Sequence, residues 1–205
     1  MRVEDYEMLG SNKTAAVVAA GIFMTACGGD VEVPQGTDEQ EVITTVTLTF
    51  TPSGGGAAIV AAFRDPDGDG GAAPTIDDIT LTLGTEYALA LSFTNELEDP
   101  PEDITEEVRD EGDEHQVFFT GSAVDGVLLH AYADMDDAGQ PLGLANTVTA
   151  TAAGSGALVV TLRHLPPIDD VDVKVPGLAD VARANGIASL PGDTDASVSF
   201  DVQVQ

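Results

Sequence analysis

The sequence predicts an all-β protein, an antiparallel immunoglobulin-like β-sandwich of about seven to nine strands with one or two short helical turns. Three observations predict this fold. Short segments alternate apolar and polar residues, as half-buried strands do. Threonine and valine dominate these segments, and both residues favour β-structure. Glycine, aspartate and proline separate the segments, which is typical of sandwiches with many tight turns.

The alternating segments run from residue 45 to residue 204. In VTLTFT, apolar residues share one face and threonines the other; the turn PSGGG follows, and AAIVAAF returns. The residues expected on inward faces are Val46, Leu48 and Phe50; Ile79, Leu81 and Leu83; Tyr87, Leu89, Leu91 and Phe93; His115, Val117 and Phe119; Val127, Leu129 and Ala131; Leu158, Val160, Leu162 and His164; and Val198, Phe200, Val202 and Val204.

Two segments predict short helices instead. Residues 103–111, DITEEVRDE, begin with an Asp-x-x-Glu pattern that resembles a capping box. Residues 177–186, GLADVARANG, end at a glycine that suits a helix C-terminus.

The N-terminal region predicts a lipid anchor. Residues 14–26, TAAVVAAGIFMTA, are uncharged, follow Lys13 and lead into Cys27, the single cysteine. A spanning helix needs roughly 20 apolar residues, so this shorter run resembles a signal peptide ending in a lipobox, with Cys27 lipidated. The alternative is a buried free cysteine. We expect residues 1–26 to be the signal peptide, 27–41 an acidic tether and 42–205 the sandwich. Acidic residues before Met8 suit a signal peptide poorly, which favours a start at Met8.

The charge excludes some partners. With 36 acidic and 7 basic residues and a net charge of −29, the chain repels phosphates, so we expect no nucleic-acid partner. An anionic membrane surface repels it as well, which leaves the lipid as the membrane anchor. Few lysines and many acids resemble proteins of salt-loving organisms, so we expect the domain to lose stability when salt is removed.

Two aspartate-rich loops are candidate calcium sites. Asp65, Asp67 and Asp69 follow a D-x-D-x-D-G spacing that suits a hard cation, although the flanking pattern is not an EF-hand. Asp134 and Asp136 form a weaker version. The alternative is that these residues are ordinary turn formers.

Two histidines are a candidate transition-metal site. His115 opens one predicted strand and His164 closes another, so neighbouring antiparallel strands place both at one edge of the sheet. With Asp113 and Glu114 nearby, the pair suits Zn²⁺ or Cu²⁺. The alternative is two ordinary strand-end histidines, and we expect a structural role for His130.

The acidic run from residue 96 to 114 is either a solvated loop, a docking surface for a basic partner or a cation trap. No Gly-x-Ser-x-Gly, P-loop or His-Glu-x-x-His pattern occurs, so we expect no enzyme activity.

Five blocks carry a family resemblance: residues 40–56, FRDPDGDGGAAPTI, DEHQVFF, YADMDDAGQPLGL and VVTLRHLPP. They resemble secreted lipoproteins of Bacteroidota-type gram-negative bacteria that are often called type 1 periplasmic-binding-fold superfamily proteins. The resemblance covers most of residues 41–205 and departs from the family at Ala138, where Asn or Asp is common. It implies a substrate-capture or accessory role beside TonB-dependent outer-membrane receptors. The α/β fold in that name needs amphipathic helices between strands, so the sandwich remains our expectation.

Together these features predict a non-enzymatic, lipid-anchored protein of the cell envelope, most consistent with the outer membrane, on its periplasmic or surface side. It would bind a ligand or metal ion as an accessory to a TonB-dependent receptor. The alternative is a structural or adhesive surface sandwich with calcium-stabilised Asp/Gly loops.

Overall fold

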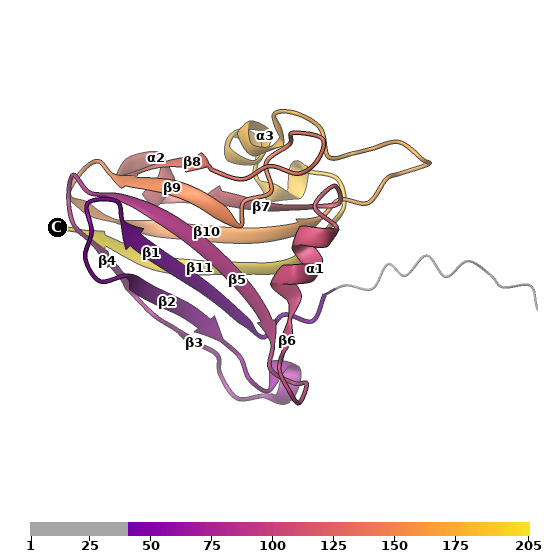
Figure 1. Ribbon diagram of the computed structural model, residues 1–205, viewed down its shortest axis with the longest axis horizontal. Coiled ribbons are helices and arrows are strands. Elements are labelled where there is room, and N and C mark those ends of the chain that lie inside the picture. Colours follow the sequence, from indigo (N-terminus) through magenta and orange to yellow (C-terminus); the bar gives the residue numbers. More distant parts are fainter. Residues whose placement is uncertain (1–40) are drawn as a thin grey trace, which may run out of the picture. The chain divides into compact units, whose positions relative to one another are not determined.

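A computed structural model describes residues 41–205, except for the side chain of Asp69. The predicted signal peptide, Cys27 and nearly all of the tether lie outside the described residues. Strand is the main secondary structure of the described part and far exceeds helix, which confirms the all-β fold. Its strands form two sheets that face each other across a shared apolar core (Figure 1).

The two sheets differ in size. The larger has the order β3 (Thr75–Ile76), β2 (Ile59–Arg64), β1 (Thr45–Pro52), β5 (Glu86–Asn95), β9 (Ala145–Ala150) and β8 (Leu128–Tyr132), with β6 (Glu102–Asp103) beside β5. The smaller has the order β4 (Ile79–Leu81), β11 (Asp193–Val204), β10 (Gly154–His164) and β7 (His115–Thr120). All neighbours are antiparallel except β4 and β11. Three of the eleven strands, β3, β4 and β6, have two or three residues.

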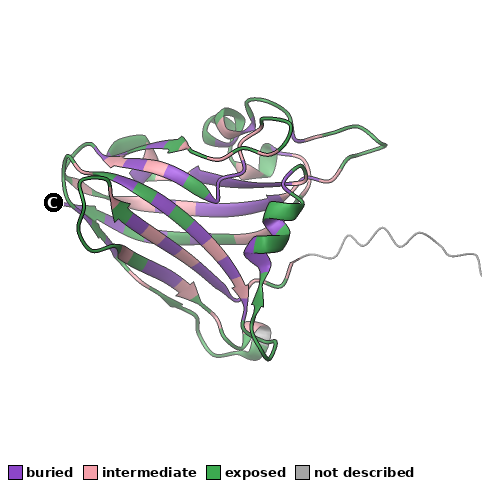
Figure 2. Ribbon diagram, in the orientation of Figure 1, coloured by how far each residue is buried: buried purple, intermediate pink, exposed green. Residues whose placement is uncertain are grey.

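Alternation along the strands builds the core, as the sequence predicts. Purple buried bands alternate with green and pink bands along β1 and β5 (Figure 2). Val46, Leu48 and Phe50 of β1 meet Phe200 and Val202 of β11 in one cluster. Each large apolar side chain buried in this way contributes about 1.5–3 kcal/mol.

The expected phase is wrong in two places. In β8 the buried residues are Leu128 and His130, whereas Leu129 is 63% exposed and Ala131 is exposed. The reason is the helix α2 (Ser122–Gly126), which the alternation does not reveal and which resets the phase before β8. Leu83 is 47% exposed because β4 ends at Leu81 and a turn follows.

The two expected helices are present. α1 (Ile104–Asp110) begins after Asp103, whose carboxylate accepts a hydrogen bond from the Thr105 N–H at 3.0 Å. α3 (Leu178–Asn185) ends before Gly186. Together with the turn η2 (Ile187–Ser189), α3 covers Phe118 of β7 in a second apolar cluster. No helix in residues 41–205 is long and apolar enough to cross a membrane.

The loop between β8 and β9, residues 133–144, closes one side of the sandwich. It lies along the edge of β7, where the Val117 N–H donates to the Leu142 carbonyl at 2.8 Å. The Tyr132 hydroxyl donates to the Val117 carbonyl at 2.8 Å. The loop comes so close that a Cβ on Gly143 would lie 2.9 Å from the Cβ of Val117. Gly143 also has a φ of 94°, which few side chains tolerate.

We therefore expect Gly143→Ala to lower the free energy of unfolding by about 2–4 kcal/mol, through backbone strain together with overpacking. Gly139→Ala is the matched control, because Gly139 has a φ of 78° but nothing within 4 Å of its Cβ position. The control should cost only about 1–2 kcal/mol. Urea denaturation measures both, and equal costs would show that the loop does not press on β7.

Candidate functional site

Several strands begin or end at one end of the sandwich, beneath α1. There His115 at the start of β7 pairs in register with His164 at the end of β10, and His164 pairs with Asp193 at the start of β11. The two imidazole rings stack with centroids 4.8 Å apart and an interplanar angle of 9°. The expected meeting of these histidines at one sheet edge is therefore confirmed.

The ring nitrogens face different partners. His164 Nε2 lies 3.4 Å from Glu114 Oε2, and His115 Nε2 lies 3.9 Å from Asp195 Oδ2. Asp113 lies along a neighbouring pocket. Within residues 41–205, no three His, Cys, Asp or Glu side chains are grouped so as to hold a metal ion. The transition-metal site with His115, His164, Asp113 and Glu114 stays a prediction, and these contacts give no further support for metal binding there.

Asp195 is a buried residue that the sequence analysis missed. The β10–β11 register shifts between Leu162 and Arg163, so Asp195 is the extra residue of a β-bulge. Its side chain is 1% exposed, and neither carboxylate oxygen has a hydrogen-bond partner. Just before the bulge, Gly192 lies against the His164 carbonyl, where any Cβ would collide.

His115 and Asp195 present two acceptors to each other. The His115 Nδ1–H donates to the Glu111 carbonyl at 3.2 Å, so Nε2 of the neutral ring carries a lone pair. Burial lowers the pKa of His115 to about 4 and raises the pKa of Asp195 to about 6. A proton on Asp195 would give this pair the donor that it lacks.

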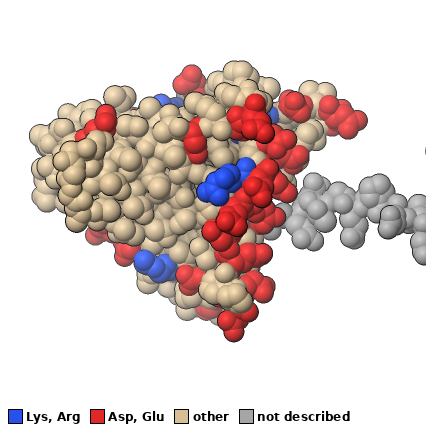
Figure 3. All heavy atoms as spheres, in the orientation of Figure 1, with Lys and Arg blue, Asp and Glu red and all other residues tan. Residues whose placement is uncertain are grey.

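Other carboxylates crowd the same end. Burial, and then the charges of Glu107, Asp195 and Glu111, raise the pKa of Glu41 to about 7. Burial and Glu107 also raise the pKa of Glu111. Acidic atoms gather over β6 and α1, whereas the end that carries the C-terminus is almost uncharged on the visible face (Figure 3). This crowding is a physical basis for the expected salt dependence.

Arg163 does not neutralise the charge of Asp195 through a direct ion pair. Its guanidinium is buried, and Nη1 donates to the Thr194 hydroxyl at 2.7 Å. Nη2 donates to backbone carbonyls, including that of Pro191 at 2.6 Å. The guanidinium therefore fastens the turn before β11 rather than pairing directly with Asp195.

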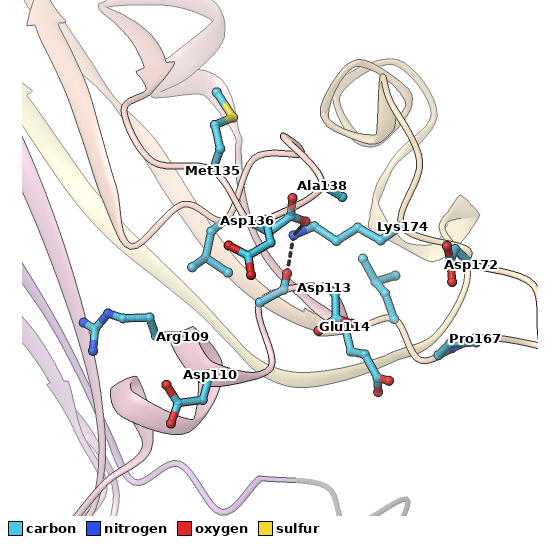
Figure 4. A pocket seen from close by; sticks show the side chains of 14 residues that line it. Arg109, Asp110, Asp113, Glu114, Met135, Asp136, Ala138, Pro167, Asp172 and Lys174 are labelled. Atoms are coloured by element: carbon cyan, nitrogen blue, oxygen red, sulfur yellow. Dashed lines mark hydrogen bonds and ion pairs between the residues drawn. The ribbon is translucent and has the colours of Figure 1, made fainter.

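A cavity of about 600 Å³ lies beside the histidines. Three segments line it: residues 109–114 at the end of α1 and just after it, residues 135–142 of the β8–β9 loop, and residues 165–174 (Figure 4). Lys174, in the third segment, contacts both of the other two. Its Nζ lies 2.7 Å from Asp136 Oδ2 and donates to the Gly112 carbonyl at 2.5 Å. Both side chains of this ion pair are 2% exposed.

The second aspartate loop uses its carboxylates internally. Asp134 accepts hydrogen bonds from the Gly143 and Ala145 N–H groups at 2.8 and 2.9 Å. Asp136 accepts from the Gln140 N–H at 2.7 Å and pairs with Lys174. These contacts match the turn-former alternative, although calcium at Asp134 and Asp136 stays a prediction.

The first aspartate loop contains the short turn η1 (Gly68–Gly70). Asp67 accepts a hydrogen bond from the Ala72 N–H at 3.1 Å, and the Gly68 N–H donates to the Asp65 carbonyl. Because the side chain of Asp69 is not described, calcium at Asp65, Asp67 and Asp69 also stays a prediction.

His130 has the contacts of a structural residue. Its Nε2–H donates to Asn146 Oδ1 at 3.0 Å, and Nδ1 accepts from Arg183 of α3 at 3.1 Å. Its ring packs on Phe119 with centroids 4.2 Å apart. His130 thereby joins β8, β9 and α3.

Comparison with known proteins adds no assignment: no family model, curated protein or solved structure matches this chain.

The buried carboxylate predicts an unusual pH dependence. The folded protein binds the Asp195 proton more tightly than the unfolded chain, because the pKa rises from 3.8 to about 6. Stability from this group is therefore present below about pH 4 and is lost as the pH rises to about 6. We expect Asp195→Asn to stabilise the protein by up to about 3 kcal/mol at pH 7.5 but by only about 1 kcal/mol at pH 4.5.

Denaturant unfolding across this pH range measures the difference. Asp201→Asn is the matched control, because Asp201 is an exposed aspartate of the same strand and should show no such trend. A gain from Asp195→Asn that is equal at both pH values would contradict the buried-acid explanation.

Proposed function

We propose that this protein is a lipid-anchored, non-enzymatic cell-envelope protein that binds a positively charged ligand and assists a TonB-dependent outer-membrane receptor. The observation that carries the proposal is the cavity of about 600 Å³ beneath α1, with carboxylates on all three of its lining segments. Small-molecule sites have volumes of about 300–1,000 Å³, so this cavity has a suitable size.

The surroundings of the cavity support ligand binding. Its lining segments are loops and strand ends held on a rigid double sheet, the usual place for binding residues. The buried Lys174–Asp136 pair fixes two of these segments to each other. A cation approaching this end meets a net negative field, which raises its local concentration and rate of association.

The anchor is supported by the sequence alone. The uncharged run before Cys27 and the small residues Thr25 and Ala26 follow the order of a lipoprotein signal. One acyl chain gives only marginal membrane binding, so a stable anchor needs more than one chain. The receptor partner is supported by the family resemblance, which covers most of residues 41–205.

Blocking the cavity tests the binding function. Ala138 is exposed at the cavity lining, so we expect Ala138→Trp to abolish retention of a small cationic compound by the purified protein. The protein is equilibrated with a defined mixture of cationic, neutral and anionic compounds, and retained compounds are identified by mass spectrometry. Ala153→Trp, in an exposed turn near the uncharged end, is the control and should retain the compound. Retention of no compound by the unchanged protein would contradict the proposal.

The anchor has its own test. We expect Cys27→Ser to move the protein from the membrane fraction to the soluble fraction and to remove the acyl mass from its N-terminal peptide. Fractionation with intact-mass measurement detects both changes. A Cys27→Ser protein that stays in the membrane fraction at molar salt would show that another element anchors it.

A further inference from the structure

We propose that the ligand of the cavity is a linear polyammonium compound, a chain of methylene groups carrying several separated positive charges. This inference rests on the proposed function and names the class of its ligand. Three features of the cavity carry it: the spread of its carboxylates, its apolar lining and the way it already holds one alkylammonium group.

The first feature is the spacing of the charges. Five carboxylates other than Asp136 line the cavity, from Asp110, Asp113, Glu114, Asp137 and Asp172. They come from three separate segments, and in residues 41–205 no three such groups meet as a metal site would require. A single hard cation needs six to eight oxygens at about 2.3–2.6 Å. Separated carboxylates instead suit a ligand whose charges are also separated.

The second feature is the accessible apolar surface of the lining. Met135 is 54% exposed, Ala138 and Pro167 are exposed, and all three line the cavity. A hydrated metal ion gains nothing from such a surface. A methylene chain does, because each CH₂ removed from water contributes favourably to binding.

The third feature is the chain's own ammonium group. Lys174 extends its methylene stem across the cavity lining toward Asp136 (Figure 4). Its Nζ is held by that carboxylate at 2.7 Å and by the Gly112 carbonyl at 2.5 Å. A buried alkylammonium is therefore stable in this lining when a carboxylate and a carbonyl hold it.

The charge balance fixes the preferred ligand charge. Lys174 and Asp136 neutralise each other, which leaves five carboxylates and the guanidinium of Arg109 around the cavity. A ligand with three or four positive charges complements this excess, whereas a monoamine neutralises only part of it. A triamine such as spermidine is thus a suitable probe.

The test is isothermal titration of the purified full chain with spermidine at low ionic strength, about 0.05 M. We expect one spermidine per chain and weaker binding of the diamine putrescine. Replacing Asp137 and Asp172 together by Asn should weaken spermidine binding at least tenfold. The control replaces Asp125 and Asp201 by Asn, which changes the net charge equally at positions outside the cavity lining. The control should weaken binding less than threefold.

Two results would overturn the inference. Equal weakening in both double variants would show that spermidine binds only through the overall charge. Displacement of spermidine by an equimolar amount of Ca²⁺ would identify an ion site. If spermidine does not bind but Ala138→Trp still removes a different retained cation, this inference fails and the proposed function stands.

Discussion

Repulsion among carboxylates at one end of the sandwich is the constraint on which the rest of the molecule depends. The topology concentrates them, because β5 ends and β7 and β11 begin beneath α1. The core of both sheets supplies the stability that holds these charges together. Acid and salt both reduce the repulsion among these carboxylates. Protons neutralise carboxylates with raised pKa values such as Glu41, and salt screens the remaining charges. The same negative charge is the basis of the proposed cation binding.

One ion pair determines whether the cavity keeps its shape. Lys174 and Asp136 lie 38 positions apart in the sequence and join the segment after β10 to the loop between β8 and β9. Removing one partner of a buried pair typically costs about 3–5 kcal/mol, because the other charge is left without compensation. Burial acts to raise the pKa of Asp136, but the hydrogen bonds from Lys174 and the Gln140 N–H lower it overall, and burial lowers the pKa of Lys174. If the cavity binds the proposed ligand, that binding and the docking of residues 165–174 would be linked through this contact.

Local patterns predicted the strands well and the site only in part. Alternation identified the buried faces of β1, β5, β10 and β11, since a period of two survives wherever one face meets the core. Alternation failed at β8, because α2 changes the phase before that strand. It also failed at Asp195, because a β-bulge near the start of β11 places this carboxylate in the interior. The positions of His115 and His164 at strand ends correctly predicted that they are neighbours. The Lys174–Asp136 pair and the cavity depend on loop packing between distant segments, which no local spacing encodes.

The few basic residues have a consequence for resistance to proteases. The described part contains five lysines and arginines, and none of them lies in an open loop. Arg64, Arg109, Arg163 and Arg183 lie in strands or helices, and Lys174 is buried. Proteases that cut after basic residues need an accessible, flexible segment, which loop tips usually provide. Within residues 41–205 the exposed loops carry aspartate, glycine and proline instead, so a trypsin-like enzyme can cut this part only after it unfolds locally.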